Sequence, residues 1–183
     1  MVHAPIIPLF SLTGILWISS FISDGFVKDD AEAKKIYQQA SVVAMVTSLC
    51  CLPIIAPISD KANPLWTMPL AFLIRFFFAG SFRFVKNPNS LLTVLLFTGL
   101  AVSSSAQAII IMGWYNRKMN KEIRGNMTNL ISIVSTAGLV LFVAITGKAY
   151  DVYGPSAPFS ILAGLDLFTC LLATALAYFG ILK

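Results

Sequence analysis

The chain has 183 residues, of which 57% are hydrophobic and only 11% are charged, and its formal net charge is +5. Soluble domains carry roughly a quarter charged residues, so a water-soluble core of this size cannot absorb so much apolar surface. The composition therefore predicts an integral, all-α membrane protein whose loop lysines and arginines meet lipid headgroups and not nucleic acid.

Six apolar segments reach the roughly 20 residues that cross a hydrocarbon core about 30 Å thick. Because lipid offers the backbone no hydrogen bonds, segments of this length are predicted to be helices. They run approximately from Ile6 to Ser23, Ala40 to Ile58, Leu65 to Phe84, Leu91 to Trp114, Met127 to Thr146, and Pro158 to Leu182. We therefore expect one transmembrane domain over residues 1–183.

The connections between these segments differ in length and charge. Asp24 to Gln39 is the longest and carries both signs, and its second half, from Asp30, is expected to form a short surface helix. The connection near Arg83 to Asn89 contains turn-forming asparagines, and Arg117 to Gly125 is the most basic one. The two predicted sides of the membrane carry equal numbers of Lys and Arg, so the count does not decide the orientation. The dense cluster of the fourth connection is the remaining indication. It favours both termini on the cytoplasmic side, or on the matrix side in an organelle.

Two of the connections share a pattern. Asp60-Lys61-Ala62-Asn63-Pro64 separates the second and third segments, and 91 residues later Asp151-Val152-Tyr153-Gly154-Pro155 separates the fifth and sixth. An acidic residue, turn-forming residues and a proline end one helix and allow another to start. Since the offset is almost half the chain, the pattern predicts two copies of a three-helix unit, at about 1–89 and 90–183.

Two charged residues lie deep within apolar segments. Arg75 is ten residues into the third segment, or about 15 Å at 1.5 Å per residue. Asp166 is eight residues into the sixth, which runs the opposite way and so reaches a comparable depth. A charge at the bilayer centre costs about 2.5–3.5 kcal/mol, so we expect the two to form a buried ion pair. Such a pair either locks helices together or relays protons or ions.

The sequence contains few residues that could support enzyme chemistry. A membrane enzyme needs a nucleophile with a base, or a metal cluster. The three cysteines lie within apolar segments, and the neighbouring Cys50 and Cys51 are predicted to be small buried hydrophobic side chains and not a redox or metal pair. The one histidine is His3. We therefore predict no catalytic residue, no metal and no cofactor.

Three segments carry a resemblance to a known family. They are Ala56-Pro57-Ile58-Ser59-Asp60-Lys61, Glu122-Ile123-Arg124-Gly125, and the stretch from Gly147 to Gly154. In this order they resemble loop motifs of the major facilitator superfamily of transporters, in the C-terminal six-helix half. The first departs from the family pattern, because Ala56 replaces its leading glycine and Asn63-Pro64 stand where basic residues follow. The resemblance implies two inverted three-helix repeats and a substrate cavity between two six-helix halves.

The resemblance also implies roles for individual residues. It places the first and fourth helices beside the cavity and makes Asp60, Lys61 and Arg124 part of the loops that change with conformation. It places the helices of Arg75 and Asp166 away from the cavity, which favours the structural ion pair over the relay. The candidates for contact with a solute are Trp17, Ser20, Ser103, Ser104 and Gln107. For each serine the alternative is helix packing, with its hydroxyl bonded to the preceding turn.

We therefore expect transmembrane transport of a small solute, by one half of a facilitator or secondary carrier. Its expected partners are the lipid bilayer, the solute, and a second six-helix half or other membrane subunits. Since the predicted cavity segments contain no acidic, basic or histidine side chain, either ion coupling would reside in the second half or the protein is a facilitator. The alternative is a structural or accessory subunit of a larger complex, derived from a transporter half.

Overall fold

The computed structural model describes residues 6–118 and 121–179, and this part of the chain contains helices and turns but no strand. The all-helical architecture expected from the composition is therefore confirmed. The elements, including two short 3-10 helices labelled η, are α1 (Ile6–Ser19), η1 (Ser20–Ile22), α2 (Asp30–Lys61), α3 (Pro64–Ser81), η2 (Phe82–Phe84), α4 (Leu91–Lys118), α5 (Lys121–Tyr153) and α6 (Ala157–Tyr178).

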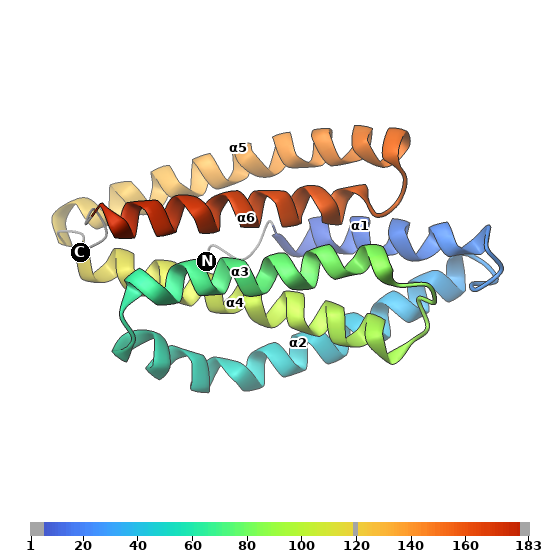
Figure 1. The fold of residues 1–183 in the computed structure, drawn as a ribbon, viewed down its shortest axis with the longest axis horizontal. Helices are drawn as coiled ribbons and strands as arrows, with labels where there is room; N and C mark the ends of the chain where they lie inside the picture. The colour runs from blue at the N-terminus through green and yellow to red at the C-terminus, as the bar shows by residue number, and fades with distance from the viewer. Residues whose placement is uncertain (1–5, 119–120, 180–183) are drawn as a thin grey trace.

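The helices lie along one another and form an elongated bundle (Figure 1). α3 packs against both α4 and α6, and α2 packs along α4, whereas α5 lies beside α6 at the edge of the bundle. Among the described residues, five helices are long and apolar enough to cross a membrane, namely α2 to α6. Their lengths and compositions are compatible with an integral membrane protein.

The first predicted segment is shorter than expected. α1 has 14 residues, or about 21 Å at 1.5 Å per residue, and the chain then tightens into η1. Ser20 Oγ donates to the Trp17 carbonyl at 2.6 Å, and Ser23 Oγ donates to the Ser20 carbonyl at 2.8 Å. Serine hydroxyls offer the backbone such local alternatives to the α-helical pattern. The prediction of one continuous helix from Ile6 to Ser23 was therefore wrong at its C-terminal end.

The predicted separate surface helix is the first part of α2. Asp29 accepts a hydrogen bond from the Glu32 backbone N–H at 2.8 Å, and the Glu32 carboxylate accepts one from the Lys28 N–H at 2.7 Å. This reciprocal cap starts a helix of 32 residues, about 48 Å long, which exceeds the thickness of a hydrocarbon core. Pro53 and Pro57 lie inside α2, which curves along its length (Figure 1), because each proline removes a backbone donor and bends the helix.

The basic fourth connection is mostly helical. α4 continues to Lys118 and α5 begins at Lys121, so the predicted loop from Arg117 to Gly125 was too long. Lysine, arginine and glutamate are strong helix formers, and hydropathy detects only the apolar part of such a helix.

Both polar hinges interrupt the helices where the sequence predicts. α2 ends at Lys61 and α3 begins at Pro64, while α5 ends at Tyr153 and α6 begins at Ala157. Gly154 in the second hinge has a φ of 88°, a conformation that favours glycine because it has no Cβ.

Candidate functional site

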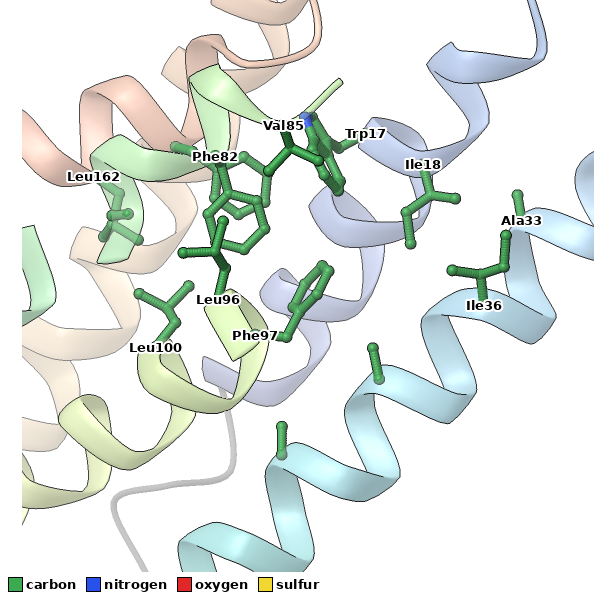
Figure 2. Close-up of a cluster of buried hydrophobic side chains, with 14 of the residues drawn as sticks. Trp17, Ile18, Ala33, Ile36, Phe82, Val85, Leu96, Phe97, Leu100 and Leu162 are labelled. Atoms are coloured by element: carbon green, nitrogen blue, oxygen red, sulfur yellow. The ribbon is translucent and has the colours of Figure 1, made fainter. Parts of the chain in front are cut away.

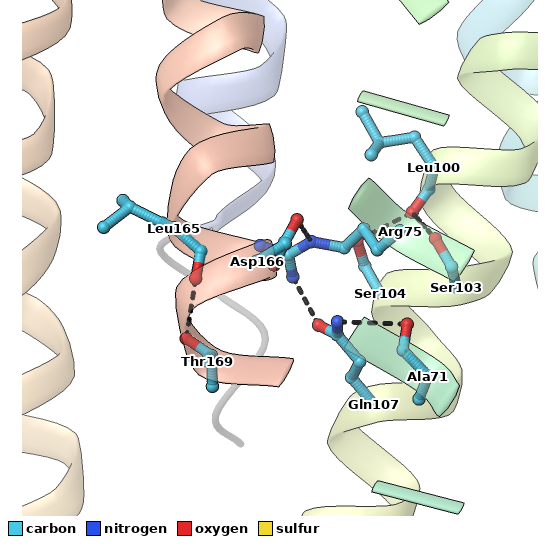
Figure 3. A network of polar contacts seen from close by, with 9 residues as sticks. All are labelled: Ala71, Arg75, Leu100, Ser103, Ser104, Gln107, Leu165, Asp166 and Thr169. Carbon is cyan, nitrogen blue, oxygen red and sulfur yellow. Dashed lines mark hydrogen bonds and ion pairs between the residues drawn. The ribbon is translucent and has the colours of Figure 1, made fainter. Parts of the chain in front are cut away.

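Three polar side chains from three helices meet inside the bundle (Figure 3). Arg75 of α3 donates from Nε to Asp166 Oδ2 of α6 at 2.9 Å. It also donates from Nη1 to Gln107 Oε1 of α4 at 2.5 Å. Gln107 in turn donates from Nε2 to the Ala71 carbonyl of α3 at 3.4 Å. We call Arg75, Gln107 and Asp166 the polar cluster.

The polar cluster lies near the middle of the helices that carry it. Arg75 is eleven residues from the start of α3, and Asp166 is nine from the start of α6, so both lie about 14–16 Å along antiparallel helices. The Asp166 side chain is 3% exposed and that of Arg75 is 18% exposed. The structure therefore brings together the two residues that the sequence predicted to pair. Their contact neutralises two charges in the interior, and Gln107 ties the pair to a third helix.

The side chain of Gln107, a candidate for contact with a solute, is hydrogen-bonded to other residues within the bundle. It is 4% exposed, its carbonyl oxygen accepts from Arg75, and its amide group donates to the backbone of α3. The sequence singled out Gln107 and Arg75 separately, because nothing in their spacing links them. Their contact arises from the packing of α3 against α4.

The serine candidates bond to their own helices. Ser103 Oγ donates to the Leu100 carbonyl at 3.1 Å, and Ser104 Oγ donates to the same carbonyl at 2.7 Å. Ser20 Oγ donates to the Trp17 carbonyl in the turn at the end of α1. These bonds satisfy the hydroxyls inside the bundle, in the way that the packing alternative describes.

Trp17 belongs to an aromatic cluster near one end of the bundle (Figure 2). It is 2% exposed, and its ring packs edge-to-face with Phe82 at a centroid distance of 5.1 Å and with Phe97 at 6.2 Å. Phe82 also stacks on Phe159 at 4.1 Å. Edge-to-face and offset-stacked rings are favoured arrangements, so this cluster joins α1, α4 and α6 through η2.

One polar contact between helices involves a residue that the sequence did not single out. Ser48 of α2 and Ser105 of α4 lie with their Oγ atoms 2.7 Å apart. Ser48 follows a valine-rich run and resembles the packing serines of any membrane helix. Its partner is 57 residues away, so only the pairing of α2 with α4 could identify this contact.

The predicted conformational loop residues lie at the end of the bundle where α2 and α4 finish (Figure 1). Lys61 is the last residue of α2 and is exposed. The side chains of Asp60 and Arg124 lie outside the described part of the structure.

No family model, no curated protein and no solved structure matches the chain. The resemblance to major facilitators therefore rests on the loop motifs of the sequence alone.

Metal-ligating side chains are dispersed over the described residues, which contain no group of three or more His, Cys, Asp or Glu able to hold a metal ion. Cys170 is buried, Cys51 is half-buried, and Cys50 is exposed. The expectation that Cys50 and Cys51 are buried was therefore wrong for Cys50, because the face of α2 that packs on α4 lies elsewhere.

Proposed function

We propose that the chain is one six-helix half of a major facilitator-type carrier, which moves a small solute across a membrane together with a second half. The observation that carries this proposal is the 91-residue offset between the two polar hinges, which recurs between Arg75 and Asp166 of the polar cluster. In such carriers inverted repeats are nested within each half, and the solute binds between the halves.

The helix boundaries support two equivalent units. α2 ends at Lys61 and α5 ends at Tyr153, which are 92 residues apart. This is within one residue of the offset between the Asp60 and Asp151 hinges. α3 and α6 each follow one of these hinges, so the order of long helix, hinge and apolar helix occurs twice.

The ion pair supports a two-fold relation between these units. Arg75 and Asp166 are also 91 residues apart, so they would occupy equivalent positions if the chain consists of two such units. A two-fold axis brings equivalent positions of two units together where it passes between them. Seven residues further along the chain from Arg75 and seven before Asp166, Phe82 stacks on Phe159. Both contacts fit an antiparallel crossing of α3 and α6 whose centre is the ion pair.

A second candidate function is that of a structural subunit derived from a transporter half. The specific observation in its favour is the occupation of the solute-contact candidates. Gln107 is bonded to Arg75 and to α3, the serines are bonded to their own helices, and Trp17 is packed among aromatic rings.

Isolation of the tagged chain in a mild detergent tests these proposals. A carrier should yield a second chain with six apolar segments in equal amount, and proteoliposomes containing the pair should take up solutes from a labelled panel.

Asp60→Asn should slow uptake about tenfold, equivalent to about 1.4 kcal/mol in the barrier, since Asp60 lies in the conformational loop. The matched control is Asp24→Asn in the first connection, which should leave the rate unchanged. A stable complex of several other subunits, without uptake, would instead establish the structural role.

A further inference from the structure

The two ends of the bundle differ in charge. The turn between α2 and α3 and the adjoining ends of α4 and α5 lie at the same end (Figure 1). Five basic and two acidic residues occur there, which we call the basic end: Lys61, Arg117, Lys118, Lys121 and Arg124, with Asp60 and Glu122. At the opposite end six basic residues stand among five acidic ones, within residues 24–35, 83–86 and 148–151. The net charges of the two ends are therefore about +3 and +1 by formal count.

Exposed aromatic residues indicate where the lipid headgroups lie at the basic end. Trp66 in the first turn of α3 is 76% exposed, and Tyr178 at the end of α6 is 86% exposed. Tryptophan and tyrosine are enriched at the headgroup level of membranes, because their rings are apolar and carry a polar group. These two side chains therefore mark a boundary of the hydrocarbon core.

Arg117 and Lys118 lie at the same end of the bundle, in the last turn of α4. Both side chains are exposed, as is that of Lys61, the last residue of α2. The bundle thus presents several positive charges at the end that carries Trp66 and Tyr178.

We propose that the basic end binds the headgroups of anionic phospholipids in the leaflet that it faces. The phosphate of a zwitterionic lipid carries a neighbouring positive choline group, whereas an anionic lipid offers uncompensated negative charge. Basic residues in the last turn of α4 also interact favourably with the helix dipole, but that interaction stabilises the helix equally in either lipid. A preference for anionic over zwitterionic lipid therefore distinguishes lipid binding by these residues from stabilisation of α4 by the helix dipole.

The test is thermal unfolding of the purified chain in neutral detergent micelles containing either phosphatidylglycerol or phosphatidylcholine. A ligand that binds the folded state raises its Tm, so the Tm should rise further with phosphatidylglycerol. Arg117→Gln with Lys118→Gln should remove at least half of that difference. The matched control is Arg83→Gln with Lys86→Gln, an exposed pair at the opposite end, which should retain most of it. High salt should abolish the difference in the unaltered protein.

Three outcomes would overturn the proposal. The first is an equal Tm rise with both lipids, and the second is an equal loss of lipid preference in the two double variants. The third is an equal Tm rise with inorganic phosphate, which would indicate a site for a free anion. Native mass spectrometry of the unaltered chain avoids any folding defect of the variants. There the protein should retain phosphatidylglycerol over phosphatidylcholine, and equal retention would contradict the proposal.

Discussion

At the scale of single residues, the polar cluster places two charged side chains in the interior of the bundle. A guanidinium and a carboxylate have lost most of their water, and their mutual attraction must offset that loss. Gln107 helps because its carbonyl oxygen accepts a second Arg75 donor, and its own amide finds the Ala71 carbonyl. Every member of the cluster thus has a partner on another helix, which makes the cluster sensitive to the loss of any one member.

Removing one of the two charges should therefore destabilise the fold more than removing both. Arg75→Leu leaves the Asp166 carboxylate buried without its cation and should destabilise the fold by about 3–5 kcal/mol. Combining Arg75→Leu with Asp166→Leu should recover most of that loss, since no unpaired charge remains. The measurement is thermal unfolding in detergent, with Ser104→Ala as a control of small effect, because its hydroxyl bonds only within α4. Equal destabilisation by the single and double variants would contradict the coupling of the two charges.

At the scale of the elements, close approach between α3 and α4 depends on a glycine. A Cβ placed on Gly99 of α4 would overlap the ring of Phe78 on α3. Gly138 of α5 has nothing within 4 Å of the same added atom. Substitutions at these two glycines therefore compare the tightness of packing around α4, inside the bundle, with that around α5, at its edge.

Gly99→Ala should destabilise the fold by about 1–3 kcal/mol, because the Phe78 ring must shift within the packed interface. Gly138→Ala should be neutral or should stabilise α5 by up to about 1 kcal/mol, since alanine is the better helix former. Thermal unfolding of the two variants beside the unaltered chain measures both effects. A neutral Gly99→Ala variant would show that the Phe78 ring does not pack tightly against Gly99.

At the scale of the whole molecule, the number of membrane crossings depends on α1. The five longer helices each have the length and hydropathy of a crossing, whereas α1 has 14 residues before the chain tightens into η1. Six crossings place both termini on one side, and five crossings place them on opposite sides. The orientation predicted from the basic fourth connection puts Lys118 on the inner side and Lys86 on the outer side.

Single-cysteine labelling of sealed cells with a membrane-impermeant maleimide measures this arrangement, after Cys50, Cys51 and Cys170 are replaced by alanine. Lys86→Cys should react from outside, and the matched variant Lys118→Cys should react only after permeabilisation. His3→Cys should behave like Lys118→Cys if α1 crosses the membrane. Reaction of His3→Cys from outside would reduce the crossings to five and would remove the six-helix half from the proposed function.

The amino-acid sequence alone was enough to predict the helical class of this protein, apolar helices long enough to cross a membrane, and the ends of the helices at the two hinges. These follow from local chemistry, because apolar length, proline and turn-forming residues act within a few positions of themselves. Depth along two antiparallel segments also sufficed to suggest that Arg75 meets Asp166, since each charge needs a partner in lipid.

The faces on which the helices meet became known only from the folded structure. It assigned Gln107 to Arg75, Ser48 to Ser105, and Trp17 to a cluster of phenylalanines, all between helices far apart in the sequence. It also joined the residues after Asp30 to α2 through the cap at Asp29, and gave α4 and α5 their polar extensions. The physical reason is that hydropathy reports the medium around a segment, whereas the partner of a side chain depends on the rotation and register of two packed helices.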